Sequence, residues 1–333
     1  YEAALMAPTQ ILAEQHYLNF QKLLGPLAIP LRLRTSSRSE DFPQPLFARP
    51  GCPSLTIGTH ALLYEKTRFE KLGLVIVDEQ HKFGVMQRAR LMRRGEAPDL
   101  LVMTATPIPR TISQTLHGDL DVSLLREKPA GRGRIVTAVR GTRKLPEITA
   151  FLKEQLADGR QAYIVYPLVE ESDTIASKAA VAEAGQWKKT LSPHTVELLH
   201  GRTPPDEKEA IMARFRAAKT LVLVATTVIE VGVDVPNATV LLVENAERFG
   251  LAQLHQLRGR IGRGTEKSFC ILVTSTPEPE PGDRLGILER TQDGFEIAEA
   301  DMRLRGPGDL LGTAQSGLPP LLAGDLLRDA DVM

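Results

Sequence analysis

Short apolar runs alternate with amphipathic stretches along the first third of the chain. Because apolar residues fill these runs with little alternation, we expect strands that are covered on both faces, as in a parallel sheet flanked by helices. The predicted strands are Ala3–Ala7, Ser54–Ile57, Leu72–Val77 and Leu100–Met103. A helix is predicted after the first of them, with Thr9 as its N-cap and with Leu12, Phe20, Leu23 and Leu24 at helical spacing.

The same rhythm restarts after a basic, glycine-rich stretch at Lys128–Arg134, which is the candidate linker. The second set of predicted strands is Ala162–Tyr166, Val196–Leu199, Leu221–Ala225, Val240–Val243 and Phe269–Val273, with helices at about 145–158, 205–218 and 250–260. The proline-rich segment Thr276–Gly282 ends this part, and two helix-like stretches follow from Asp283. The pattern predicts an α/β protein with two sheet domains and a helical tail.

Length and composition agree with this division. A chain of 333 residues with 42% hydrophobic and 25% charged residues is typical of a globular protein of about two domains. No apolar run approaches the roughly 18 residues that a membrane-spanning helix needs. Cys52 and Cys270 lie far apart without metal-ligand spacing, so we expect reduced thiols in a reducing compartment.

Charge is balanced overall but not locally. The chain carries 41 basic and 41 acidic residues, whereas residues 81–144 carry 13 basic and 5 acidic ones. A local basic excess indicates nucleic-acid binding more directly than net charge does, and it is also typical of an ordinary solvated face.

Two carboxylates follow the predicted strand Leu72–Val77. Asp78 and Glu79 suit a nucleotide site, because one can hold Mg²⁺ while the other orients or deprotonates the attacking water. An acidic N-cap of the next helix is the equally weighted alternative. Thr104 and Thr106 end the next strand, where they could relay between a phosphate site and a neighbouring domain or simply cap a turn.

Arginine and glycine alternate in the segment Gln253–Gly264. Glycine is unfavourable inside a helix, so packing alone would not select this pattern. Arg258, Arg260 and Arg263 could present planar, permanently charged groups to phosphate. The alternative is a solvated basic end of a helix.

Polar residues also follow two strands of the second domain. Thr226 and Thr227 could donate hydrogen bonds to a nucleic-acid phosphate, and Asp234 could contact a ribose or a metal. The stretch that ends at Pro236 is equally typical of a turn. Arg202 places a further basic residue beyond a strand.

The order of these motifs resembles that of superfamily-two helicases and translocases. The segments DEQH (78–81), TAT (104–106), ATTVIEVGVDVP (225–236) and QLHQLRGRIGR (253–263) are similar to motifs II, III, V and VI. More narrowly, the chain resembles the RecG family of bacterial ATP-dependent helicases, which remodel branched DNA. The likeness covers nearly the whole chain and ends in DMRLRGPGDLLGTAQSG (301–317), which is similar to the family's translocation motif.

The resemblance implies two RecA-like lobes that clamp ATP and Mg²⁺, followed by a helical hairpin that couples lobe motion to duplex DNA. By this likeness, residues 1–140 are the remainder of the first lobe, 141–281 the second lobe, and 282–333 the translocation hairpin and tail. Asp78 is implied as the Mg²⁺ ligand and Glu79 as the residue that activates water.

The likeness also implies roles for residues outside the acidic motif. Arg260 and Arg263 are the implied arginine fingers, and Gln256, Gly232 and Asp234 lie by the nucleotide. The residues implied in coupling or DNA contact are His81, Thr104, Thr106, Thr226, Thr227, Arg202, Arg303, Arg305 and Gln315.

The family's phosphate loop, GxxxxGK[ST], does not occur in this chain, and neither does its amino-terminal wedge domain. We therefore expect a carboxy-terminal part of a helicase that is inactive alone and hydrolyses ATP when complete. Two alternatives stay open: a transcription-repair coupling translocase, which shares the carboxy-terminal motif, and a DNA-binding pseudoenzyme. An α/β metabolic enzyme would leave the arginine–glycine segment unexplained.

The resemblance also implies partners and location. The DNA substrates are stalled forks, Holliday junctions and R-loops, and the processes are recombination and repair. The implied protein is a monomer in the bacterial cytoplasm that works at the nucleoid without a membrane, with single-stranded-DNA-binding protein as a further partner.

Overall fold

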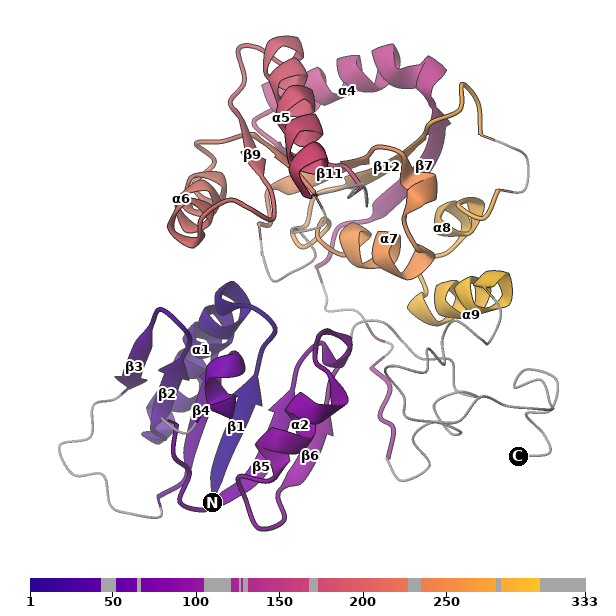
Figure 1. The fold of residues 1–333 in the computed structure, drawn as a ribbon. Coiled ribbons are helices and arrows are strands. Elements are labelled where there is room, and N and C mark those ends of the chain that lie inside the picture. The colour runs from indigo at the N-terminus through magenta and orange to yellow at the C-terminus, as the bar shows by residue number, and fades with distance from the viewer. Residues whose placement is uncertain are drawn as a thin grey trace, which may run out of the picture. The chain divides into compact units, whose positions relative to one another are not determined.

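The computed structural model describes residues 1–42, 52–64, 67–104, 121–125, 127, 131–167, 173–226, 235–279 and 283–305 (Figure 1). The chain divides into two compact units. Unit 1 contains the described residues up to Thr104, and unit 2 contains those that follow. Each unit is built on its own sheet.

The sheet of unit 1 has the strand order β3-β2-β4-β1-β5-β6. Its strands are β1 (Glu2–Met6), β2 (Leu31–Arg34), β3 (Ser39–Phe42), β4 (Ser54–Gly58), β5 (Leu72–Val77) and β6 (Asp99–Val102). Neighbouring strands are parallel except β2 and β3, which form an antiparallel hairpin. The helices are α1 (Gln10–Leu24) and α2 (Val85–Met92), with 3₁₀ turns at Gly25–Leu27, His60–Leu63 and Gln80–Lys82.

Alternate residues of β1, together with Ala7 directly after it, face two hydrophobic cores, one on each side of the sheet. Ala4 and Met6 belong to a core that also contains Leu62 and, from α2, Leu91. Leu5 and Ala7 belong to a second core, which contains the α1 residues Ala13 and Tyr17. Because both faces of β1 are covered, the strand needs apolar residues at consecutive positions, and the run Ala3–Ala7 supplies them.

Helix α1 begins as predicted but buries a different face. The Thr9 hydroxyl accepts a hydrogen bond from the backbone N–H of Leu12 at 3.4 Å, which confirms the predicted N-cap. The buried residues of the helix are Ala13 and Tyr17, and Phe20 and Leu24 pack beside them. Leu23 lies off this face and is 68% exposed.

The sheet of unit 2 is parallel throughout its described strands, in the order β7-β12-β11-β8-β10-β9. Its strands are β7 (Ile135–Gly141), β8 (Gln161–Val165), β9 (Val196–Leu199), β10 (Val222–Ala225), β11 (Ala238–Val243) and β12 (Ser268–Thr274). The helices are α4 (Leu145–Ala157), α5 (Asp173–Thr190), α6 (Pro205–Arg216), α7 (Leu251–Arg258), α8 (Gly286–Arg290) and α9 (Gly294–Arg305), with 3₁₀ turns at Thr142–Lys144 and Ala246–Arg248.

Helices cover both faces of the second sheet. Figure 1 shows α4 and α5 on the same side, where Leu152 and Trp187 pack against Ile164 of β8 and neighbouring strand residues. The preceding residue of β8, Tyr163, points to the opposite face, and its ring centroid lies 5.1 Å from that of Phe215 on α6. The predicted α/β fold with two parallel-sheet, RecA-like lobes is confirmed.

The second sheet begins earlier than the boundary we predicted at residue 140. Strand β7 pairs with β12 from Ile135↔Ser268 to Gly141↔Thr274, so residue 140 lies inside this edge strand. The polar residues Thr137 and Arg140 interrupt the apolar pattern of β7, which is why the sequence did not predict it as a strand.

The expectations of reduced cysteines and of no membrane-spanning helix can be compared with the described residues. Cys52 is exposed, Cys270 is buried, and both are free thiols. None of the helices in the described ranges combines the length and apolar character needed to cross a membrane.

Candidate active site

Three strands of unit 1 end at one edge of the sheet, and the loops that follow them carry the predicted acidic and hydroxyl residues. The backbone N–H of Asp78 donates to the carbonyl of Met6 at 3.0 Å. The N–H of Met103 donates to the carbonyl of Val77 at 2.8 Å. Asp78, Glu79 and Thr104 therefore follow strands whose carboxyl ends are in register, which is where α/β sheets bind ligands.

The carboxylate of Asp78 is 17% exposed and accepts hydrogen bonds on both oxygens. Oδ1 accepts the backbone N–H of Glu79 at 2.9 Å. Oδ2 lies 2.8 Å from Nε2 of His16, which is on α1. Sequence reasoning missed His16, because it lies 62 positions from Asp78 and only the fold of the sheet brings the two together.

Glu79 has left-handed backbone geometry, with φ 50° and ψ 57°. Few residues other than glycine adopt this region, and the cost of doing so is typically of order 1 kcal/mol. Glu79 lies at the N-cap position of the 3₁₀ turn Gln80–Lys82, but its side chain makes no capping hydrogen bond there, and the N-cap of α2 is Gly84. The strained turn is therefore consistent with a functional loop.

Helix α7 and the loop after it carry the arginine–glycine segment in unit 2. Gln256 is half-buried on α7, Arg260 is 9% exposed, and Nε of Arg263 donates to the carbonyl of Gly259 at 3.4 Å. Gly262 has φ +71°, and a Cβ there would lie 2.7 Å from Ile135. Both backbone geometry and space thus require glycine between the last two arginines.

Arg258 does not present its guanidinium to a ligand. It is 3% exposed, and Nη1 donates to the carbonyls of Leu288 at 2.7 Å and Thr291 at 2.9 Å. Nη2 lies 3.0 Å from Nδ1 of His255, which must be the acceptor because a guanidinium only donates. Burial lowers the pKa of this guanidinium. The possible phosphate contact of Arg258 is therefore wrong, and its role is to join α7 to the end of α8.

Replacing Arg258 with methionine should destabilise unit 2 by about 2–4 kcal/mol, because buried carbonyls lose their donors. Urea unfolding followed through Trp187, the single tryptophan and a core residue of unit 2, measures this loss. Arg303→Met is the control, since the Arg303–Glu299 pair is largely exposed and should contribute less than about 1 kcal/mol. Equal midpoints for the two variants would contradict the structural role of Arg258.

An acidic group lies beyond β11 in unit 2. The pKa of the Glu244 carboxyl is raised to about 7. Burial is the main cause, and the negative charges of the neighbouring Glu183 and Glu247 contribute to the same shift. Next to it, the Trp187 indole donates to the Tyr166 hydroxyl at 2.7 Å, and that hydroxyl donates to Glu183 at 3.2 Å. Glu244 is thus held in an environment that favours its neutral form.

Glu244→Gln should remove a pH dependence from the stability of unit 2. The pKa of this carboxyl is about 7 in the folded protein and near 4.5 in the unfolded chain. The stability that it contributes is therefore fully present below pH 4.5 and is lost as the pH rises through 7. The variant should match the unaltered chain at pH 4.5 and exceed it at pH 8.5 by up to about 3 kcal/mol. Urea midpoints from Trp187 fluorescence at the two pH values provide the test; a difference independent of pH would contradict the assignment.

The structure describes the side chains of some of the remaining predicted site residues and not those of others. Thr226 is 3% exposed, and its hydroxyl has no hydrogen-bond partner among the described residues. The backbone N–H of Arg202 donates to Nδ1 of His200, and Arg303 on α9 pairs with Glu299 at 2.7 Å. His81 lies in a 3₁₀ turn and Arg305 ends α9, but their side chains are outside the description. The predicted residues that lie outside the described ranges are Thr106, Thr227, Gly232, Asp234 and Gln315.

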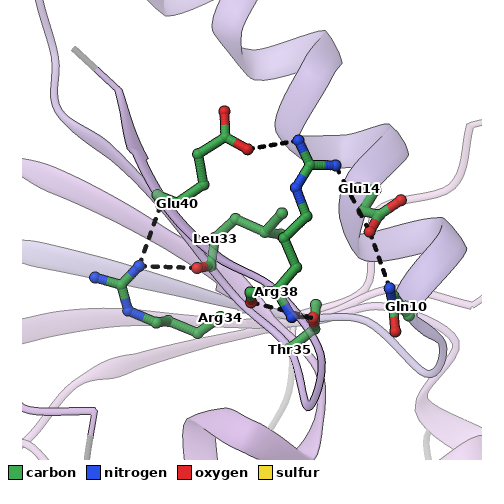
Figure 2. A network of polar contacts seen from close by, with 7 residues as sticks. All are labelled: Gln10, Glu14, Leu33, Arg34, Thr35, Arg38 and Glu40. Atoms are coloured by element: carbon green, nitrogen blue, oxygen red, sulfur yellow. Dashed lines mark hydrogen bonds and ion pairs between the residues drawn. The ribbon is translucent and has the colours of Figure 1, made fainter. Parts of the chain in front are cut away.

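The β2–β3 hairpin forms a polar network with α1 (Figure 2). Arg38, at the turn, pairs with Glu40 on β3 at 2.5 Å and lies 3.8 Å from Glu14 on α1. Gln10 donates to Glu14 at 3.1 Å and accepts from the Ser37 hydroxyl at 2.7 Å. The hairpin is thereby attached to the helix that also carries His16.

Family models match three consecutive parts of the chain. Residues 1–115 match the DEAD/DEAH box helicase model and residues 143–265 match the helicase conserved C-terminal domain. Residues 291–333 match the model of ATP-dependent DNA helicase RecG, domain 3, C-terminal. The three matches thus follow one another in the same order as the motifs in the sequence.

Relatives named ATP-dependent DNA helicase RecG align with the whole chain. The protein from Synechocystis sp. is 51% identical over 336 residues, covering 100% of this chain and 40% of its own. The protein from Streptococcus pneumoniae is 45% identical, covering 100% of this chain and 50% of its own. Over its whole length, the chain is similar to RecG helicases. It spans 40–50% of the length of these two RecG relatives.

A solved RecG structure extends the likeness to three dimensions. The structure of RecG bound to a three-way DNA junction is 38% identical, has a TM-score of 0.73, and covers 100% of this chain and 43% of its own. The match to the RecG-specific model begins at residue 291 and therefore includes α9.

Proposed function

We propose that the chain is the motor part of an ATP-dependent DNA helicase that remodels branched DNA. The observation that carries the proposal is the identity of 38% over the whole chain to a RecG bound to a three-way junction. The gathering of Asp78, Glu79 and Thr104 at one sheet edge supports it, because nucleotide chemistry in α/β sheets takes place at such edges.

The donor set of unit 1 suits Mg²⁺. This ion prefers oxygen ligands and is usually bound by one or two carboxylates together with nucleotide phosphates and water. Asp78 supplies one half-buried carboxylate of fixed orientation, and Glu79 follows it. When bound, Mg²⁺ neutralises charge that develops on the phosphates.

In this proposal, Glu79 orients and deprotonates the water that attacks the γ-phosphate. Its left-handed backbone turns the chain directly after the carboxylate that is assigned to the metal. Thr104 and Thr106, after β6, couple the state of the nucleotide to movement.

Arg260 and Arg263 supply positive charge to the phosphates in the transition state, and Gln256, Gly232 and Asp234 line the nucleotide. A permanently charged, planar guanidinium suits this task, and a donated arginine accelerates phosphoryl transfer by about 10³–10⁵-fold. The Arg258 contacts hold the start of this loop against α8, so the two arginines extend from a fixed helix end.

Contact with DNA is assigned to two groups of residues. His81, Thr226, Thr227 and Arg202 follow strand ends, whereas Arg303, Arg305 and Gln315 belong to the translocation motif. We propose that the active protein is a monomer, that it works in the bacterial cytoplasm at the nucleoid, and that it meets single-stranded-DNA-binding protein there. The RecG relatives favour this function over a transcription-repair coupling translocase, and the presence of Asp78, Glu79, Arg260 and Arg263 argues against a pseudoenzyme.

Unwinding of a labelled three-way junction by the full-length natural protein tests the proposal. Strand separation should require ATP and Mg²⁺ and should stop with a non-hydrolysable ATP analogue. Junction binding without strand separation under all these conditions would overturn it in favour of the DNA-binding pseudoenzyme.

A further inference from the structure

The side chain of His16, a residue outside the predicted motifs, is in contact with the Asp78 carboxylate. Its Nε2 lies 2.8 Å from Oδ2, a normal distance for a charge-assisted hydrogen bond. Because an ionised carboxylate only accepts, Nε2 carries the hydrogen in this contact.

The two hydrogen bonds of Asp78 come from different structural elements. One donor is the backbone of Glu79, which continues from β5, and the other is a side chain of α1. A single bond would leave the carboxylate free to rotate about Cβ–Cγ. Two bonds, one to each oxygen, hold it in one plane.

The helix that carries His16 is itself fixed. The hydroxyl of Thr9 caps its first turn, Ala13 and Tyr17 are buried in the core, and Glu14 contacts the β2–β3 hairpin through Arg38. His16 is half-buried, with 22% of its side chain exposed. The imidazole is therefore presented from a rigid element, as a supporting group must be.

We propose that His16 is a positioning residue that orients Asp78 for a divalent cation. This rests on the function proposed above, in which Asp78 binds Mg²⁺. Residues that hydrogen-bond to a metal ligand typically change metal affinity or activity by 10–100-fold when they are replaced. A purely structural bond between α1 and β5 would instead change stability and leave metal affinity unaltered.

Mn²⁺ binding in the presence of ADP, measured by electron paramagnetic resonance in the full-length natural protein, separates the two roles. His16→Phe keeps a ring and removes the donor, so the dissociation constant for Mn²⁺ should rise about tenfold. His16→Gln should stay within about threefold, because the glutamine Nε2 can occupy the place of the imidazole Nε2. His16→Asn, whose amide corresponds to Nδ1, should behave like His16→Phe and serves in its place if that variant does not fold.

Asn19→Leu, at an exposed position of the same helix, is the matched control and should bind Mn²⁺ like the unaltered protein. Equal Mn²⁺ affinity in the unaltered protein and in His16→Phe or His16→Asn would overturn the inference alone. Failure of His16→Gln to restore affinity would also overturn it. Absence of Mn²⁺ binding to the unaltered protein would overturn both this inference and the proposed metal role of Asp78.

Discussion

Replacing Glu79 with glutamine should lower ATP turnover by the full-length natural protein by about 10²–10⁴-fold, the usual contribution of a general base. Glutamine keeps the shape of the side chain but cannot accept a proton from water. The left-handed turn at Glu79 and the contacts of Asp78 do not depend on the Glu79 carboxylate, so nucleotide binding should persist. Steady-state hydrolysis together with equilibrium binding of a fluorescent ATP analogue measures both properties.

Glu96→Gln is the matched control for this prediction, since Glu96 is an exposed glutamate of the same unit. Its turnover should equal that of the unaltered protein. Loss of nucleotide binding in Glu79→Gln, or turnover within a few-fold of normal, would contradict the role assigned to Glu79.

Replacing Arg263 with lysine should lower kcat for ATP hydrolysis by about 10³-fold or more. Lysine keeps the positive charge but not the planar, bidentate group that fits phosphate oxygens. Arg263 is half-exposed, and it follows Gly262, whose positive φ sets the direction of the loop. Because the transition state gains more from the arginine than the bound substrate does, the change should appear in kcat more than in KM.

The control for Arg263→Lys is Arg216→Lys, at an exposed position where α6 ends in the same unit. It should hydrolyse ATP at the unaltered rate. A value of kcat for Arg263→Lys within about fivefold of normal would remove Arg263 from the catalytic group, since a donated arginine contributes far more than that.

Most strands that the sequence predicted are buried on both faces, although β6 was predicted too and has no buried residue. The runs at β1, β5, β8 and β11 are almost continuously apolar, because helices cover both sides of each strand. Strand β2 was missed because Leu31 and Leu33 alternate with Arg32 and Arg34, and only the leucines are buried. Strand β3 was missed because Ser39–Phe42 is a mostly polar edge strand with no buried residue to mark it.

The candidate site was predicted where a motif lies within a few residues of sequence. Asp78 and Glu79 are adjacent, and the structure places them beside Thr104 at one sheet edge. Contacts between distant parts of the chain were not predictable in this way. His16 contacts Asp78, which lies 62 positions away, and Arg258 contacts the carbonyl of Leu288, which lies 30 positions away. Only the fold brings these partners together, so only the structure shows that His16 supports a carboxylate and that Arg258 supports a helix end.

ATP hydrolysis by the full-length natural protein, compared on a model fork and on linear duplex of equal length, tests the central claim most directly. A motor that remodels branched DNA should be stimulated strongly by the fork and much less by the linear duplex. Equal stimulation by the two DNAs would contradict the branched-DNA assignment and indicate a general duplex translocase. No stimulation by either would contradict the motor function itself.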